Sequence, residues 1–330
     1  MSAFALPRSR HHSVFMRLSM LAILGLPISA CSTLTSTTST ESLTPEIEPP
    51  TVALVLGGGG AKGFAHVGVI KALEEQGITP TLIVGTSVGS LVGSLYASGY
   101  TPSQLEQLAL TTADSELTDF VLSNQGFVEG IKLKNFINNK VGGRAIESFP
   151  IRFAAVAAEK NTLTKAVFTT GDAGLAVQAS CSIPNIFIAP RIPETVGKKY
   201  IDGGVVSLVP VDSARDLGAD IVIAVDVTTP SSNNSTSSIN NMPTLNSISS
   251  LWGFFENSIA TQPTTNRTSA MRQERNRADI VITPDVGHIS SIDTKQRRAL
   301  ITAGTQATTP QIAAIKQLIK QKSQSKYATL

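Results

Sequence analysis

Apolar residues gather in short continuous runs that are separated by polar and glycine-rich segments. The runs are rich in β-branched residues and too short for most helices, so they predict strands that are buried on both faces of a sheet. The clearest of them, together with two weaker ones, fall at residues 51–56, 82–84, 153–158, 165–169, 220–226 and 279–282.

Helical patterns alternate with these strands. Helices are expected at residues 64–76 and 88–98, and another begins at Thr101, a plausible cap, with Pro102 in the first turn. Residues 311–326 place isoleucines on one side and basic residues on the other. This helix could lie on a membrane, but packing on the sheet is the favoured interpretation. Strands that alternate with helices predict an α/β fold around a mostly parallel sheet.

The first 30 residues have the pattern of a secretory signal. Residues 1–17 are basic and free of acids, and residues 18–30 form an apolar run that ends in small residues. That run is shorter than the roughly 20 apolar residues of a transmembrane helix. Residues 28–31 (Ile-Ser-Ala-Cys) resemble a bacterial lipobox, which predicts that Cys31 is lipidated and becomes the new N-terminus. The alternative is an ordinary secretory signal with an incidental cysteine.

Two polar segments divide the rest of the chain. Residues 31–50 are rich in Ser, Thr and Pro and predict a flexible tether. Residues 229–247 interrupt the α/β pattern and are expected to be a loop insertion, because a strand signal resumes after them. The residue after Cys31 is Ser32 and not an acid, which favours the periplasmic face of the outer membrane over retention in the inner membrane.

Composition narrows the class of protein. The 330 residues are 42% hydrophobic and 15% charged, which excludes a disordered or fibrous chain. The formal charge of +3 comes from three arginines in the first 30 residues, so a nucleic-acid partner is not expected. Two cysteines exclude a disulfide framework, and the sequence has no metal-ligand cluster or calcium loop, so we expect no cofactor.

The glycine-rich segment at residues 57–63 joins a predicted strand to a helix, where backbone N–H groups can form an anion site. Its Gly58-x-Gly60-x-x-Gly63 spacing fits a dinucleotide fingerprint, but the second strand lacks the acidic residue of that fold. A phosphate-binding P-loop would need Lys and Ser or Thr after the second glycine, and neither is present there. The remaining interpretation is an oxyanion hole.

Residues 85–89 (Gly-Thr-Ser-Val-Gly) form a G-x-S-x-G motif between a predicted strand and a predicted helix. In that context the motif is typical of a nucleophile elbow, which raises the serine hydroxyl above the end of the sheet. Gly85 and Gly89 leave room for the sharp turn, and the N–H of Val88 faces the same space. Ser87 is therefore the candidate nucleophile.

The general base has more than one candidate. The α/β-hydrolase order would assign it to His288, which is the histidine downstream of Ser87, although a surface loop explains this residue equally well. His66 either packs beside the glycine-rich segment or lines the site. The stronger candidate is Asp202, which ends a short strand and precedes Gly203 and Gly204; a simple β-turn is the alternative.

The glycine-rich segment, the elbow and the Asp-Gly-Gly sequence, in this order, resemble the patatin-like phospholipase family. The resemblance spans residues 51–228 and returns weakly near 278–291. One departure is the Ser-Leu-Val-Pro sequence at residues 207–210, where many members of the family have Asn-Pro-x-Pro.

The resemblance implies a three-layer α/β/α fold and a dyad in which Ser87 attacks an ester and Asp202 replaces histidine as the base. A free aspartate near pKa 3.9 is a poor base at neutral pH, so the site must bury Asp202 or bind the oxyanion strongly. The implied oxyanion donors are Gly58, Gly59, Gly60 and Val88. The implied supporting residues are Lys62, Gly63, Gly85, Gly89, Gly203 and Gly204.

With this resemblance, we interpret residues 1–30 as a signal peptide, 31–50 as a tether and 51–330 as one hydrolase domain with core motifs at 51–228 and a C-terminal extension at 248–330. The expected substrate is a membrane phospholipid or lysophospholipid, and the expected anchor is lipidated Cys31. The oligomeric state is not predicted. Three alternatives stay open: a general carboxylesterase, a non-catalytic envelope lipoprotein that keeps the fold, and a hydrolase that uses His288.

Overall fold

The computed structural model describes residues 49–228 and 265–328, which belong to one compact unit. The predicted signal peptide, Cys31, nearly all of the tether and the polar insertion at 229–247 lie outside the described residues.

The described residues form an eight-stranded sheet with the order β5-β6-β3-β2-β1-β7-β8, and β4 pairs with β3. The strands from β3 to β8 along this order run parallel, whereas β4 and β6 run antiparallel to β3 and β5 runs antiparallel to β6. The prediction of a mostly parallel sheet is confirmed. The strands are β1 (Val52–Leu56), β2 (Leu82–Thr86), β3 (Arg152–Glu159), β4 (Lys165–Phe168), β5 (Arg191–Ile192), β6 (Lys198–Asp202), β7 (Ile221–Val225) and β8 (Ile280–Ile282).

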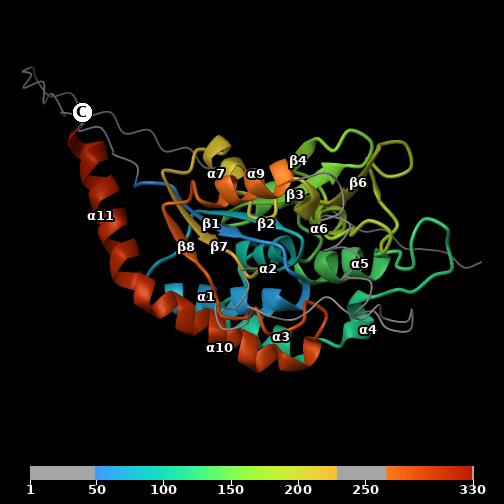
Figure 1. The fold of residues 1–330 in the computed structure, drawn as a ribbon, viewed down its shortest axis with the longest axis horizontal. Coiled ribbons are helices and arrows are strands. Elements are labelled where there is room, and N and C mark those ends of the chain that lie inside the picture. Colours follow the sequence, from blue (N-terminus) through green and yellow to red (C-terminus); the bar gives the residue numbers. More distant parts are fainter. Residues whose placement is uncertain (1–48, 229–264, 329–330) are drawn as a thin grey trace, which may run out of the picture. The chain divides into compact units, whose positions relative to one another are not determined.

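Helices cover both faces of this sheet, which makes three layers (Figure 1). Alternate residues of β1 show why: Leu54 and Leu56 enter the larger core cluster, whereas Ala53 and Val55 enter the smaller cluster on the opposite face. The smaller cluster packs under α7 (Val211–Asp216), which contacts α9 (Thr265–Arg275). The larger one packs under α1 (Phe64–Glu74), α2 (Val88–Ala97), α3 (Pro102–Thr111), α5 (Ile131–Lys140), α6 (Ala173–Ser180) and α10 (Arg297–Thr308).

Local sequence explains where several helices begin and how closely they pack. Thr101 caps α3 as predicted, because its hydroxyl accepts the N–H of Gln104 and the Gln104 side chain returns to the Thr101 N–H. Helix α10, which the hydrophobic pattern did not predict, lies backbone against backbone on α1. A Cβ at Gly304 would lie 2.0 Å from the carbonyl oxygen of Ala65, so only glycine permits this contact.

The C-terminal helix α11 (Ile312–Ala328) covers the predicted helical segment. Its Ile315 is fully buried in the larger core cluster, which agrees with packing on the protein for the first part of the helix. In the part of the chain that the structure describes, no helix is both long enough and apolar enough to cross a bilayer.

Candidate active site

Ser87 occupies a sharp turn between β2 and α2. Its backbone has φ 54° and ψ −128°, a conformation that side-chain-bearing residues rarely adopt and that is typical of a strained nucleophile elbow. The turn is fixed by a hydrogen bond from the Ser87 N–H to the hydroxyl of Ser180 (2.9 Å), which in turn donates to the carbonyl of Val156 (2.6 Å). Ser180 is a supporting residue whose role the three motifs did not indicate, although the sequence around it (residues 179–184) is also similar to bacterial members of the family.

The glycines of the elbow allow α2 to begin directly against the sheet. A Cβ at Gly89 would lie 2.0 Å from the carbonyl oxygen of Leu56 at the end of β1. A Cβ at Gly85 would lie 2.5 Å from the backbone of Gly89, and one at Gly63 would lie 2.3 Å from the Val88 side chain. These close approaches give a physical reason for the predicted supporting roles of the three glycines.

Asp202 ends β6 with its carboxylate buried. Its Oδ1 accepts the N–H of Gly204 (2.7 Å), whereas Oδ2 has no hydrogen-bond partner among the described residues. Gly203 packs against the backbone of β3, where a Cβ would lie 2.2 Å from the carbonyl oxygen of Val156. Burial raises the pKa of Asp202 to about 6, although the Ser87 hydroxyl and the Gly204 N–H oppose this shift.

The sheet register brings Ser87 and Asp202 together. Thr86 pairs with Val156 on β3, and Asp202 pairs with the next residue, Ala157. The Ser87 hydroxyl is close enough to Asp202 to influence the pKa of the carboxyl group, but the two side chains form no direct hydrogen bond in this structure. Such contacts are often long in a free enzyme and shorten when substrate binds.

The predicted oxyanion donors divide into two groups. The Gly58 N–H donates to the carbonyl of Leu208 (3.0 Å), so its expected role needs correction: this group anchors the glycine-rich segment and is not free for a substrate. The N–H groups of Gly59, Gly60 and Val88 donate to no other described residue. Val88 is the first residue of α2, where the N–H has no partner within the helix and the helix dipole favours negative charge.

His66 is buried beneath the glycine-rich segment. Its Nε2 lies 2.8 Å from the carbonyl oxygen of Gly57, and burial lowers the pKa of the imidazole to about 4. The ring is therefore neutral at pH 7, and its Nε2–H donates to Gly57. His66 consequently fits the interpretation as a packing residue, which holds this segment from below.

Two other candidates, His288 and Lys62, form no hydrogen bond or ion pair with Ser87 or Asp202 among the described residues. His288 is exposed in the segment after β8. In the described part of the chain, it forms no hydrogen bond with Ser87 and is not among the residues that line the cavity next to Ser87, which is described below. Lys62 is buried in the short 3-10 helix Gly60–Gly63, and its amino group has no ion pair with any described acid.

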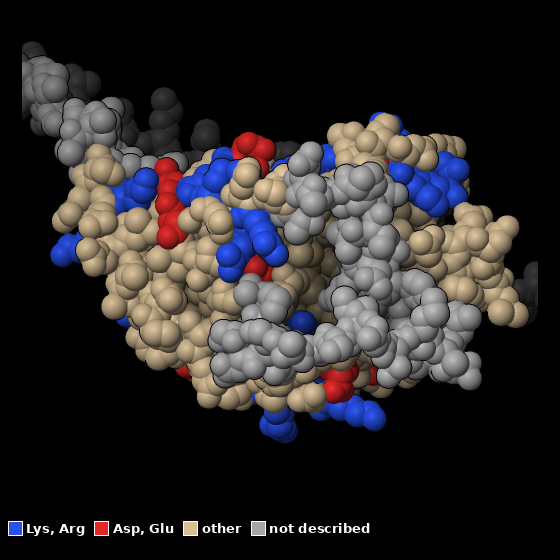
Figure 2. All heavy atoms as spheres, in the orientation of Figure 1, with Lys and Arg blue, Asp and Glu red and all other residues tan. Residues whose placement is uncertain are grey.

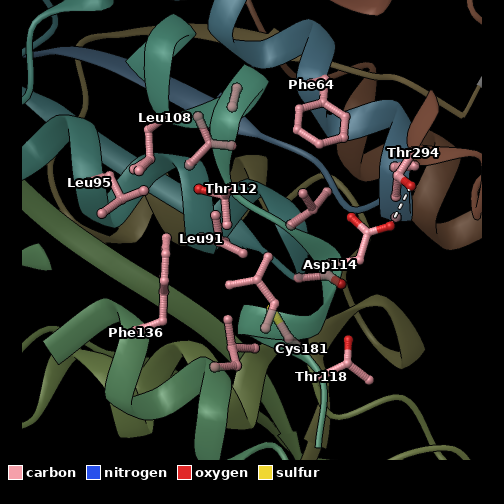
Figure 3. A pocket seen from close by; sticks show the side chains of 18 of the residues that line it. Phe64, Leu91, Leu95, Leu108, Thr112, Asp114, Thr118, Phe136, Cys181 and Thr294 are labelled. Carbon is pink, nitrogen blue, oxygen red and sulfur yellow. Dashed lines mark hydrogen bonds between the residues drawn. The ribbon is translucent and has the colours of Figure 1, made fainter. Parts of the chain in front are cut away.

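A cavity of about 260 Å³ opens beside Ser87 and is lined mainly by apolar side chains of α2, α3 and α5. Figure 3 shows Leu95, Leu108 and Phe136 at one side of it, and Asp114 and Thr294 at the other. The cavity therefore has an apolar interior and a polar rim, and Ser87 lies in its wall.

Cys181 also lines this cavity. Its thiol is buried, and burial together with the charge of Asp202 raises the pKa of Cys181 far above its usual range. The group therefore stays protonated, with its sulfur 3.9 Å from the hydroxyl of Ser90. Across the residues that the structure describes, no three His, Cys, Asp or Glu side chains are grouped closely enough to hold a metal ion.

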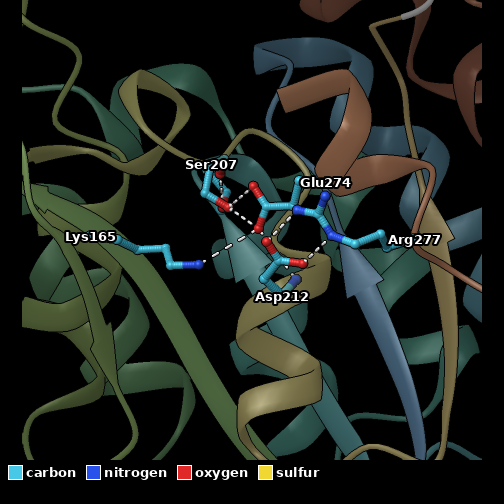
Figure 4. A network of polar contacts seen from close by, with 6 residues as sticks. Lys165, Ser207, Asp212, Glu274 and Arg277 are labelled. Atoms are coloured by element: carbon cyan, nitrogen blue, oxygen red, sulfur yellow. Dashed lines mark hydrogen bonds and ion pairs between the residues drawn. The ribbon is translucent and has the colours of Figure 1, made fainter. Parts of the chain in front are cut away.

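A network of polar side chains lies beside α7 and α9, on the face of the sheet opposite to α2, and supports the site from there (Figure 4). Glu274 of α9 accepts the Ser207 hydroxyl at 2.8 and 2.9 Å, and Lys165 lies 3.7 Å from the same carboxylate. Asp212 donates its N–H to Glu274 (3.3 Å) and forms an ion pair with Arg277. Glu274 is a supporting residue that the sequence analysis missed, because α9 carries no apolar periodicity.

This network connects directly to the elbow. The carbonyl of Ser207 accepts the Thr86 hydroxyl (2.9 Å), and the next residue, Leu208, accepts the Gly58 N–H. The departure from the family pattern at residues 207–210 therefore lies where the glycine-rich segment and the elbow are tied together, and Glu274 fixes it there.

We expect Glu274→Ala to lower the free energy of unfolding by about 2 kcal/mol, because the buried Ser207 hydroxyl loses its acceptor. Arg277→Ala is the matched control: it removes a largely exposed ion pair and should cost under about 1 kcal/mol. Urea unfolding of both variants measures the difference, and equal losses would contradict the role given to Glu274.

Comparison with known proteins agrees with the motifs and the fold. Residues 54–215 match the family model for patatin-like phospholipase, a region that holds both Ser87 and Asp202. The chain belongs to the patatin-like phospholipase family. The family predicted from the three motifs is therefore confirmed, while lipid anchoring through Cys31 stays a prediction.

Individual relatives share only part of their length with this chain. An uncharacterized NTE family protein of Mycobacterium tuberculosis is 36% identical over 184 residues, which cover 54% of this chain and 49% of the relative. Human patatin-like phospholipase domain-containing protein 6 is 33% identical over 183 residues, which cover 54% of this chain and 13% of that protein. This chain thus spans about half the length of the mycobacterial relative and a smaller share of the human one.

Among solved structures, VipD from Legionella pneumophila is similar in fold. The TM-score is 0.55 at 13% sequence identity, and the match covers 81% of this chain and 67% of VipD. The likeness supports the patatin-like architecture of three layers around a mostly parallel sheet.

Proposed function

We propose that this protein is a serine acyl-ester hydrolase that acts on phospholipids or lysophospholipids. The observation that carries the proposal is the pairing of a strained, buried Ser87 with a buried Asp202. The Oδ2 of Asp202 has no hydrogen-bond partner among the described residues, and the pKa of this carboxyl group is raised to about 6. A base with a pKa near neutral pH suits general acid–base chemistry. Burial thus supplies the basicity that an ordinary aspartate lacks.

In the proposed mechanism, Ser87 Oγ attacks the ester carbonyl while Asp202 Oδ2 accepts the hydroxyl proton. The N–H groups of Gly59, Gly60 and Val88, which donate to no described residue, bind the oxyanion of the tetrahedral intermediate. Asp202 then gives the proton to the leaving alcohol, and the acyl group remains on Ser87. Asp202 next activates a water molecule, which attacks the acyl carbon and releases the fatty acid.

The apolar cavity beside Ser87 is the proposed site for the acyl chain. Its lining is predominantly aliphatic and aromatic, and burial of each methylene contributes about 0.8 kcal/mol. A long acyl chain therefore gains much more binding free energy there than an acetyl group. This favours lipid esters over short soluble esters as substrates.

Leu108→Trp should shift the preference of the enzyme toward short acyl chains, because the larger side chain fills part of the cavity. We expect the ratio of kcat/KM for p-nitrophenyl decanoate to that for p-nitrophenyl acetate to fall about tenfold, which corresponds to the exclusion of roughly two methylene groups at about 0.8 kcal/mol each. Leu110→Trp, on the same helix but outside the cavity lining, is the matched control. A ratio that stays unchanged in Leu108→Trp would place the acyl chain elsewhere.

Labelling with a fluorophosphonate probe, combined with fatty-acid release from phospholipid vesicles, tests the proposed function. We expect the wild type to be labelled and to release fatty acid, and Ser87→Ala to do neither. Labelling with hydrolysis of soluble esters alone would instead identify a general carboxylesterase. A folded wild type that is not labelled would identify a non-catalytic lipoprotein.

The cellular location is proposed from the sequence pattern alone. A lipidated Cys31 would hold the enzyme at the periplasmic face of the bacterial outer membrane, next to its lipid substrate. Metabolic labelling with a fatty acid should mark the wild type and not Cys31→Ser.

A further inference from the structure

Three large apolar side chains at two neighbouring turns are exposed to solvent. Phe120 and Leu122 lie in the loop between α4 (Asp114–Leu117) and α5; Phe120 is 66% exposed and Leu122 is fully exposed. Val196, 82% exposed, lies in the turn between β5 and β6. Apolar side chains gathered at protruding turns are typical of a surface that meets another apolar phase.

The loop that carries Phe120 and Leu122 is held in a defined position. The Val121 N–H donates to the carbonyl of Phe127 (2.9 Å), and the N–H groups of Phe127 and Val128 donate to Ile186 (2.8 and 3.0 Å). These bonds attach the loop to the segment that contains Phe187. The loop is therefore a fixed protrusion.

The same loop adjoins the proposed acyl-chain cavity. Thr118, at the start of the loop, lines the cavity, and so does Phe187, which forms a backbone bridge with Val128. A surface that rests on this loop consequently lies close to the cavity beside Ser87.

Basic side chains surround the second turn. Lys160, Arg191, Lys198 and Lys199 line a depression together with Val196, and none of the described acids lines it. Figure 2 shows blue side chains gathered at the upper right beside a tan protrusion. The depression therefore combines one exposed apolar side chain with four positive charges.

A hydrogen bond joins the depression to the apolar loop: Lys199 Nζ donates to the side chain of Gln125 (2.8 Å). The acids of this region have other partners as well. Glu194 pairs with Lys134 (2.6 Å), Glu159 accepts bonds from Asn161 and Thr162, and Asp119 accepts the N–H groups of Gly130 and Lys132. Glu159 also interacts with the charge of Lys198. The face thus presents apolar tips next to four basic side chains, of which Lys198 is partly balanced by Glu159.

We propose that this docking face, formed by Phe120, Leu122, Val196, Lys160, Lys198 and Lys199, binds the surface of an anionic phospholipid bilayer. The apolar tips enter the boundary of the acyl chains, and the lysines contact the lipid phosphates. The proposal rests on the proposed function, because docking here brings lipid to the cavity beside Ser87. A nucleic acid would use the lysines without needing Leu122.

Vesicle co-sedimentation tests the docking face. The protein is the chain from residue 31, the form that the predicted cleavage leaves, with Cys31→Ser to exclude an acyl anchor and Ser87→Ala to prevent hydrolysis. The vesicles are phosphatidylcholine with or without phosphatidylglycerol. The test variants are Leu122→Asp and the pair Lys160→Glu with Lys198→Glu. The control is Lys320→Glu with Lys322→Glu on α11, whose side chains are also exposed.

Each basic residue near an anionic surface contributes roughly fivefold to binding. We therefore expect the double lysine variant to bind vesicles with phosphatidylglycerol at least fivefold more weakly. Leu122→Asp replaces an inserted apolar side chain with a negative charge, so it should also lose at least fivefold. The α11 control should lose less than twofold. A smaller loss in either test variant, or an equal loss in the control, overturns the proposal.

The outcome is separable from that of the proposed function, because binding is measured without hydrolysis. With Ser87 restored, the variant Leu122→Asp should hydrolyse a soluble ester within twofold of the wild type. A larger loss would mean that the substitution disturbs the site and would overturn the assignment of Leu122 to docking alone. Absence of a probe adduct at Ser87 would contradict the proposed hydrolase function. The vesicle binding of the test variants would still decide whether the docking face exists.

Discussion

Replacement of Asp202 by asparagine is expected to lower kcat/KM for ester hydrolysis by at least about a thousandfold, a loss typical of removing one member of a catalytic unit. Asparagine keeps the size of the side chain and can still accept the Gly204 N–H through its oxygen. It cannot accept the proton of Ser87. The loss therefore reports the base and not the shape of the turn.

The pH dependence of the wild type supplies an independent measurement. Because Asp202 must be ionised to act as a base, kcat/KM should rise with pH through an apparent pKa near 6 and level off above it. An unburied aspartate would give a rise near pH 4. A profile without an inflection between about pH 5 and 7 would contradict the burial argument.

The Asp202 carboxyl should also make the free energy of unfolding depend on pH, and this quantity should fall over the pH range in which activity rises. The folded-state pKa of Asp202 is raised from 3.8 to about 6, so the folded protein holds a proton that the unfolded chain releases between these values. The wild type therefore loses stability as pH rises from about 4 to 6. Asp202→Asn has no carboxyl group to titrate at this position. The free energy of unfolding of the variant minus that of the wild type, measured with urea, should therefore be greater at pH 8 than at pH 4.

His288→Ala is the control that separates the two candidate bases. Since His288 is exposed and does not line the cavity, its removal should change kcat/KM by less than about threefold. Loss of activity in His288→Ala, with activity retained in Asp202→Asn, would favour a serine–histidine hydrolase.

Much of the central sheet could be predicted from the sequence because its strands are buried on both faces. Runs such as residues 52–56 and 221–225 carry no polar residue, so their signal does not depend on the partner strand. The elbow could be predicted for a similar reason: the motif is local, and the flanking strand and helix give its context. The resemblance to the patatin-like family, which rests on three motifs in a fixed order, then implied that Ser87 and Asp202 act together.

Contacts that depend on tertiary structure could not be read from the sequence. Helix α9 has a strongly polar sequence, and its role follows from one buried carboxylate, Glu274, that reaches Ser207 across the sheet end. Likewise, the Gly58 N–H was expected to face a substrate, but the carbonyl of Leu208 comes from a segment 150 residues later and takes it. Hydrogen-bond partners at such separations have no local pattern.

Ser87→Gly is expected to abolish ester hydrolysis and probe labelling, and at the same time to raise the free energy of unfolding by about 1 kcal/mol. The backbone of Ser87, at φ 54° and ψ −128°, lies in a region that glycine adopts without steric cost. Relief of such backbone strain stabilises the folded state by about 1–3 kcal/mol. Glycine also gives the unfolded chain more conformational freedom, which lowers the free energy of unfolding by roughly 0.5–1 kcal/mol and leaves a smaller net increase.

Ser94→Gly is the matched control, because Ser94 lies inside α2, the helix that Ser87 precedes, and glycine relieves no backbone strain there. Its substitution should lower the free energy of unfolding by about 1 kcal/mol and also removes the bond from its hydroxyl to Leu91. The two serine-to-glycine changes are thus expected to have opposite signs in urea unfolding at pH 7. A loss of stability in Ser87→Gly equal to that in Ser94→Gly would mean that the elbow stores no strain. Opposite signs would mean that the geometry presenting Ser87 to an ester is maintained at the expense of the stability of the fold.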